Sequence, residues 1–110
     1  MKLYILYGVK TADFEEARRW VAEACGFEAM GRANEYNGNY YSFGPFGGER
    51  LKLISGTCND EDGAYPAERN FTGWKLLLRL DNTMEQSPIL AALDREPQKF
   101  EKLRSESAGP

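Results

Sequence analysis

The densest group of chemically active side chains lies in the segment 56–70. It contains the carboxylates Asp60, Glu61, Asp62 and Glu68, and no basic residue precedes Arg69 in this segment. Clustered carboxylates can bind calcium or share acid and base roles in glycoside hydrolysis. A calcium loop does not fit this spacing, because Cys58 would be at position one and Arg69 at position twelve. Neighbouring carboxylates also lack the separation that hydrolysis needs across a substrate. We therefore expect an exposed acidic surface with no metal and no catalytic residue.

The chain contains no histidine, which removes several kinds of chemistry. Ser-His-Asp and Cys-His nucleophiles, His-ligated metals and a histidine base are excluded. Cys25 and Cys58 are too few for a secreted disulfide scaffold, and they have neither CxxC nor zinc spacing. The glycine-rich segment 44–48 lacks the GK[ST] ending of a phosphate-binding loop. We therefore expect a non-enzymatic protein without a cofactor.

The charge distribution indicates which partners the chain would attract. Residues 1–57 contain seven basic and seven acidic side chains, whereas 58–110 contain seven basic and ten acidic ones, so the net charge of −3 comes from the second half. An acidic surface repels nucleic acid and attracts a basic protein. No apolar run approaches the ~18 residues of a membrane span, and the N-terminal run lacks a signal-peptide cleavage pattern. We expect a cytoplasmic protein that binds neither nucleic acid nor membrane.

Aromatic side chains are concentrated around Asn37-Gly38, at Tyr36, Tyr40, Tyr41, Phe43 and Phe46. Alternation along a strand places Tyr40 and Tyr41 on opposite faces, so one of these two tyrosines should lie outside the core. An exposed tyrosine is a frequent hot spot in protein recognition. Tyr40, and Tyr65 within the acidic segment, are therefore candidate partner-binding residues, while packing of most of these rings in the core remains the alternative.

The elements that must position these residues fit one domain of 110 residues with 42% hydrophobic and 28% charged residues. Lys2–Val9 is typical of a central strand. A helix follows from an N-cap at Thr11 or Asp13 and ends at Gly26. Asn37-Gly38 predicts a hairpin with a two-residue type I′ turn. A further strand covers 50–55, with Arg50 and Lys52 on a wet face.

The second half of the chain begins with a long loop over 56–70. Alternating residues then predict a strand from Thr72 to Asp81, and Ser87-Pro88 starts a helix. Glu96-Pro97 breaks this helix, Phe100 and Leu103 suggest a last helical turn, and 105–110 should form a flexible tail. The order is β-α-β-β-β-loop-β-α, which predicts an α+β domain with a mainly antiparallel sheet of about five strands covered on one face by two helices.

Part of the second half is similar to the small bacterial immunity proteins of contact-dependent and polymorphic toxin systems. The likeness lies in Tyr65-Pro66, in Phe71-Thr72-Gly73-Trp74-Lys75-Leu76-Leu77-Leu78 and in Ser87-Pro88-Ile89-Leu90-Ala91-Ala92-Leu93. The resemblance implies a cytosolic, acidic inhibitor that binds a cognate protein toxin, often a basic nuclease domain, and blocks its active surface. On this interpretation the contacts are Asp60, Glu61, Asp62 and Glu68, with Tyr40 and Tyr65 as aromatic anchors.

The first half resembles one βαβββ module of the glyoxalase and bleomycin-resistance superfamily. The residues that carry the likeness are Asp13-Phe14-Glu15-Glu16-Ala17, Cys25-Gly26-Phe27-Glu28 and Tyr41-Ser42-Phe43-Gly44-Pro45-Phe46-Gly47-Gly48. Because the chain has no histidine, this resemblance implies a metal-free protein that binds a small aromatic ligand. Its pocket would be lined by Tyr4, Trp20 and Phe43 and closed by dimerisation. The sequence leaves the oligomeric state open.

Overall fold

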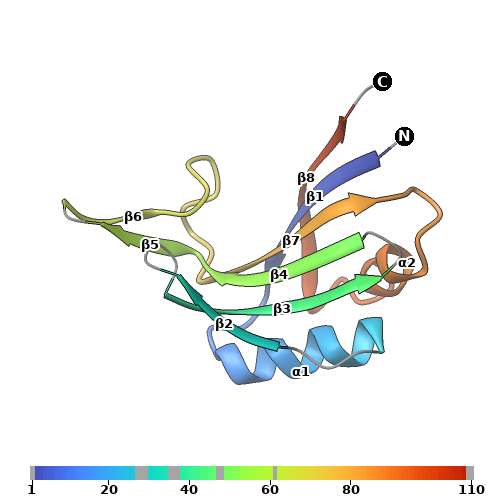
Figure 1. Ribbon diagram of the computed structural model, residues 1–110, viewed down its shortest axis with the longest axis horizontal. Coiled ribbons are helices and arrows are strands. Elements are labelled where there is room, and N and C mark those ends of the chain that lie inside the picture. The colour runs from blue at the N-terminus through green and yellow to red at the C-terminus, as the bar shows by residue number, and fades with distance from the viewer. Residues whose placement is uncertain (1, 27–29, 35–37, 47–48, 61, 109–110) are drawn as a thin grey trace.

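The computed structural model describes residues 2–26, 30–34, 38–46, 49–60 and 62–108. Figure 1 shows its elements, which are β1 (Lys2–Val9), α1 (Phe14–Cys25), β2 (Met30–Asn34), β3 (Gly38–Phe46), β4 (Glu49–Ser55), β5 (Thr57–Asp60), β6 (Gly63–Pro66), β7 (Leu76–Thr83), α2 (Pro88–Asp94) and β8 (Phe100–Ala108). The predicted α+β class is confirmed.

Six strands form one antiparallel sheet in the order β2-β3-β4-β7-β1-β8, and β5 and β6 form a separate hairpin. The first strand of the chain therefore lies inside the sheet, between β7 and β8. Its burial on both faces explains why its sequence is apolar almost throughout.

Both helices begin at the predicted caps. Asp13 precedes α1 and its carboxylate accepts hydrogen bonds from the backbone N–H groups of Glu15 and Glu16, while α1 ends at Gly26 with a φ of 78°. Ser87 precedes α2 and accepts from Ile89 N and Leu90 N at 3.2 and 3.4 Å. These local signals fix the starts of both helices.

The hydroxyl of Ser87 also connects α2 to the sheet. It donates to Oε1 of Glu49 at 2.5 Å, and the buried Thr83 hydroxyl donates to the same oxygen. Glu49 at the start of β4 therefore satisfies the two buried hydroxyls that lie at the end of β7 and the start of α2.

The core has two parts, one on each face of the sheet. The larger part packs the helices against the strands, and includes Ala17 and Val21 of α1 and Ile89, Leu90 and Leu93 of α2. On the other face Leu6, Ile54 and Leu77 are buried under Phe71 and Trp74 of the segment that follows β6. The prediction that two helices cover one face of the sheet is confirmed, but the centre of the opposite face is covered as well. Arg50 and Lys52, which the sequence placed on a solvent-facing side of their strand, are exposed.

The C-terminal prediction was wrong. Phe100 and Leu103 belong to β8 and not to a helical turn, and 105–108 of the expected flexible tail pair with Lys2–Ile5 of β1. Phe100 lies in the helix-side core, whereas Leu103 packs on the opposite face. The spacing of three residues, which suggested a helix, instead places one apolar side chain of the edge strand β8 on each face of the sheet.

Two further predictions differ in detail. Gly38 already pairs with Asn34, so a two-residue Asn37-Gly38 turn does not fit the register of β2 and β3; Tyr36 and Asn37 lie outside the described residues. The long loop over 56–70 contains the β5–β6 hairpin, and the following strand begins at Leu76 instead of Thr72.

Candidate functional site

The predicted acidic segment forms a hairpin that projects from the main sheet. β5 and β6 pair from Thr57↔Pro66 to Asp60↔Gly63, and this hairpin, 57–66, extends beyond the ends of β4 and β7 in Figure 1. We call it the acidic hairpin. Gly63 follows the tip with a φ of 116°, a conformation that favours glycine.

The base of the acidic hairpin is fixed to the sheet by backbone contacts. Gly56 N donates to the carbonyl of Lys75 at 2.8 Å, and Ala67 N donates to the carbonyl of Gly56 at 2.9 Å. A Cβ at Gly56 would lie 1.8 Å from the carbonyl oxygen of Trp74, so this approach requires glycine. The hairpin is thus a projecting element on a firmly packed base.

The structure brings some of the predicted contact residues together on the acidic hairpin. Asp62 is exposed beside the tip, and Tyr65 is 38% exposed on β6. The backbone of Asp60 pairs with Gly63 at the end of β5, whereas Glu61 lies outside the described residues. Asp60 and Asp62 therefore both belong to the tip region.

Glu68 has a different position from the one the sequence suggested. Its side chain is only 14% exposed, and its carboxylate pairs with Arg104 at 2.6 Å and Arg79 at 3.6 Å. Arg79 also donates to the carbonyl of Ala67 at 3.4 Å. Glu68 thus holds the segment after the hairpin against β7 and β8. We therefore assign Glu68 a structural role and no longer count it among the partner-binding carboxylates.

Tyr40 lies on β3, outside the acidic hairpin. It is half-buried and packs against the cluster of Leu6, Ile54 and Leu77. The ammonium group of Lys52 lies 5.1 Å from the centroid of its ring. The sequence suggested Tyr40 as an exposed anchor, but its ring is half-buried and engaged within the chain.

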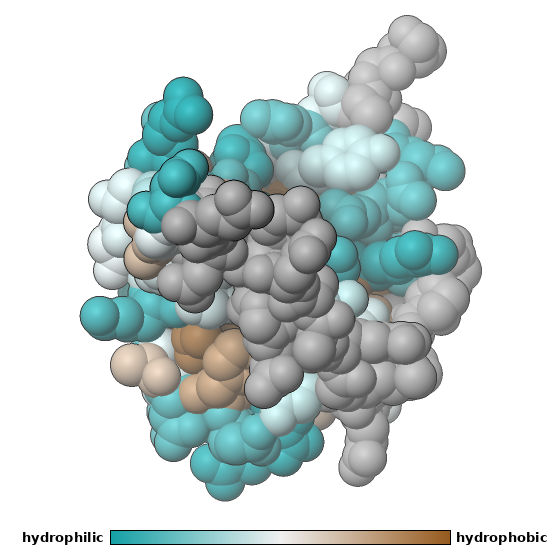
Figure 2. All heavy atoms as spheres, turned by 60° about the vertical axis from the view of Figure 1, so that its left-hand side comes forward, coloured by the Kyte–Doolittle hydropathy of each residue, from teal (hydrophilic) through white to brown (hydrophobic). Residues whose placement is uncertain are grey.

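Figure 2 shows the molecule with the left-hand side of Figure 1, where the acidic hairpin projects, turned forward. The described atoms on this face are mostly hydrophilic, with one small hydrophobic area. The described part of this face therefore carries mainly polar and charged groups and no large apolar patch.

Two tyrosine hydroxyls bind carboxylates elsewhere in the fold. Tyr7 donates to Oδ1 of Asp94 at 2.6 Å, and burial, followed by this hydrogen bond, raises the pKa of Tyr7. Tyr41 donates to Glu15, which raises the pKa of Tyr41 and lowers the pKa of the Glu15 carboxyl. Both phenols are held in their protonated form, which is unfavourable for a nucleophile or a general base.

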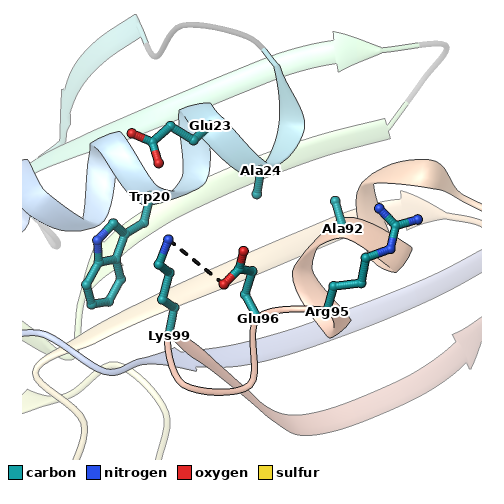
Figure 3. A pocket seen from close by; sticks show the side chains of 7 residues that line it. All are labelled: Trp20, Glu23, Ala24, Ala92, Arg95, Glu96 and Lys99. Carbon is teal, nitrogen blue, oxygen red and sulfur yellow. Dashed lines mark ion pairs between the residues drawn. The ribbon is translucent and has the colours of Figure 1, made fainter.

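The aromatic pocket suggested by the first half does not form as expected. Phe43 is fully buried in the core, and Tyr4 is 40% exposed with its hydroxyl 3.4 Å from Oδ1 of Asn82. Trp20 instead lines a pocket of about 230 Å³ between α1, α2 and the turn before β8, together with Glu23, Ala24, Ala92, Arg95, Glu96 and Lys99 (Figure 3). We call it the α1–α2 pocket.

Sequence reasoning missed most of the residues that line the α1–α2 pocket. The sequence pattern identified Glu96 only as part of the Glu96-Pro97 helix break. The one available signal was the alanines at 24 and 92, whose small side chains leave space where two helices meet. That space depends on the packing of the helices, which the sequence pattern does not specify.

Within the described ranges, no group of three or more Cys, Asp or Glu side chains is placed to hold a metal ion. None of the described helices has the length and apolar character needed to cross a membrane. No protein-family model, curated protein or solved structure matches this chain.

Proposed function

We propose that this chain is a non-enzymatic cytoplasmic protein of the immunity or inhibitor type, which binds a basic protein partner through the acidic hairpin. The observation that carries the proposal is a projecting hairpin with an acidic tip whose base is fixed to the sheet. The resemblance of the second half to immunity proteins supports a cognate toxin with a basic nuclease domain as the partner.

The fixed base of the acidic hairpin supports a role in recognition. Ordering a loop on binding costs free energy, so an element already held in one conformation binds with a smaller entropic penalty. The backbone hydrogen bonds of Gly56 and Ala67 and the ion pairs of Glu68 provide this order before a partner arrives.

The charge and the aromatic ring of the hairpin have complementary roles. Acidic residues at the tip, including Asp60 and Asp62, would accelerate encounter with a basic surface and select against acidic partners. Tyr65, at 38% exposed, offers a ring and a hydroxyl that a partner pocket could desolvate. We therefore propose Tyr65 as the anchor and the acidic tip as the steering element.

The experiment is purification of the tagged chain after co-expression with the products of its neighbouring genes. Light scattering during size-exclusion chromatography would measure the mass of any complex, and mass spectrometry would identify the partner. We expect a 1:1 complex with a basic protein and weaker inhibition of that protein's activity by the Asp60→Lys/Asp62→Lys variant. The matched control is Glu85→Lys/Glu101→Lys, which makes the same charge change outside the hairpin.

Equal inhibition by the hairpin variant and the wild-type chain would overturn the assignment of the site. A homodimer that carries no other protein would overturn the inhibitor proposal and favour the ligand-binding interpretation. Thermal unfolding of each variant separates lost contacts from lost folding, because substitutions at exposed positions such as Asp62 and Glu85 should change the free energy of unfolding by less than about 0.5 kcal/mol.

A further inference from the structure

The α1–α2 pocket is separate from the acidic hairpin. It lies on the helix side of the sheet, between the C-terminal half of α1 and the end of α2 (Figure 3). Ala24 from α1 and Ala92 from α2 both line it from the two helices, and the turn that leads to β8 closes one side. The space exists because two alanines occupy positions where larger side chains would bring the helices into contact.

Trp20 forms a fixed aromatic wall of this pocket. Its ring packs edge-on against Phe100, with centroids 6.4 Å apart and an interplanar angle of 82°, and Phe100 is itself buried. The ammonium group of Lys99 lies 5.6 Å from the indole centroid. The indole therefore offers an apolar surface and a π face that already attracts a cation.

The charged side chains of the pocket are balanced in sign. Glu23 and Glu96 carry negative charge, and Arg95 and Lys99 carry positive charge. The one ion pair among these four described side chains joins Lys99 to Glu96 at 3.9 Å, near the outer limit for an ion pair. Among the residues that the structure describes, Arg95 and Glu23 have no ion-pair partner.

We infer that the α1–α2 pocket binds a small zwitterion of the α-amino acid class. A ligand that carries only a carboxylate would be repelled by Glu23 and Glu96, and a ligand that carries only an ammonium group would be repelled by Arg95 and Lys99. A zwitterion satisfies both signs: the Arg95 guanidinium donates to its carboxylate, and the pocket's glutamates accept from its ammonium group.

The size of the pocket limits the ligand. Its volume of about 230 Å³ lies below the range of roughly 300–1,000 Å³ that is usual for drug-sized ligands. A single amino acid is small enough, and an apolar or aromatic side chain would lie against the indole of Trp20. This inference does not depend on the proposed partner-binding function, because the two sites share no residue.

The two tryptophans of the chain provide a direct test by NMR, since Trp20 lines the pocket and Trp74 lies on the opposite face. We would titrate the ¹⁵N-labelled chain with phenylalanine, N-acetyl-phenylalanine and phenylalaninamide. Phenylalanine should shift the Trp20 indole signal to saturation and leave the Trp74 signal unchanged. Each blocked derivative should bind about tenfold more weakly, as expected when one charge-assisted hydrogen bond is lost.

Variants test the assignment of the charges. Arg95→Gln should weaken phenylalanine binding about tenfold, whereas Arg50→Gln, the same change on the opposite face of the sheet, should not alter it. Ala92→Leu should abolish binding by filling the pocket while every charge is kept. Absence of a saturable Trp20 shift would overturn the inference, and so would equal binding of phenylalanine and either blocked derivative.

Discussion

The indole ring of Trp74 lies directly against the backbone of Gly8 in β1. A Cβ placed on Gly8 would come within 2.4–2.5 Å of three atoms of that ring. Trp74 thereby closes the small core of Leu6, Ile54 and Leu77 on the face of the sheet away from the helices. The absence of a side chain at residue 8 is what allows this closure.

Gly8→Ala should therefore destabilise the fold by about 1–3 kcal/mol, the usual cost of overpacking a core. Urea denaturation followed by circular dichroism measures this change. Gly73→Ala is the matched control, because a Cβ there meets nothing within 4 Å. Equal stability of both variants would contradict the close packing of Trp74 on β1.

Removal of the Glu68 carboxylate should loosen the segment that follows the acidic hairpin. Glu68→Gln is expected to cost about 1–2 kcal/mol, because hydrogen bonds to charged groups are stronger than neutral ones. Glu106→Gln removes a carboxylate that is 65% exposed and 3.5 Å from the same Arg104, and should cost less than about 0.5 kcal/mol. Chemical denaturation of the two variants compares them, and a larger effect at Glu106 would contradict the structural role of Glu68.

Stability should fall at alkaline pH through Tyr7. Burial, and then the hydrogen bond to Asp94, raise the pKa of this phenol above its ordinary value of about 10. The unfolded chain therefore loses the Tyr7 proton at a lower pH than the folded chain does. The contribution is complete below pH ~10 and declines as the pH rises above that value.

Tyr7→Phe should flatten this alkaline decline, because the variant has no proton to lose at residue 7. The free energy of unfolding, measured from pH 8 to pH 11 by urea titration, tests the expectation. A slope above pH ~10 that is the same in the variant and in the wild-type chain would show that Tyr7 is not its source.

Deletion of 105–110 should destabilise the sheet, although these residues form a polar segment. The deletion removes the partner of Lys2–Ile5 in β1 and several ladder hydrogen bonds, each contributing about 0.5–1.5 kcal/mol. We expect a lower melting temperature and faster hydrogen exchange in β1. The full-length Ser105→Ala/Ser107→Ala variant keeps the backbone ladder and should retain the wild-type melting temperature.

The features that the sequence predicts well are local ones. The bounds of Lys2–Val9 agree with β1, and the caps at Asp13 and Ser87 lie within three residues of the N–H groups they bind. β8 was missed because its partner, β1, is at the other end of the chain. Without that partner, Phe100 and Leu103 have a spacing that resembles a helical turn.

The candidate site was predicted only in part for a related reason. Charge density identified the acidic segment, and exposure of Asp62 and Tyr65 agrees with that prediction. The same charge pattern could not distinguish Glu68 from the exposed carboxylates, because its ion-pair partners Arg79 and Arg104 come from β7 and β8. The α1–α2 pocket likewise depends on how two helices meet, which is a property of tertiary packing.

The position of β1 between β7 and β8 has a consequence for biosynthesis. β1 is synthesised before both of the strands that it pairs with, residues 76–83 and 100–108, so it has no sheet partner until those residues have been made. Its buried residues, Ile5, Leu6 and Tyr7 among them, stay exposed to water during that interval. Contacts this distant in sequence slow folding and prolong the aggregation-prone stage, so this sheet cannot close before β8 has been synthesised.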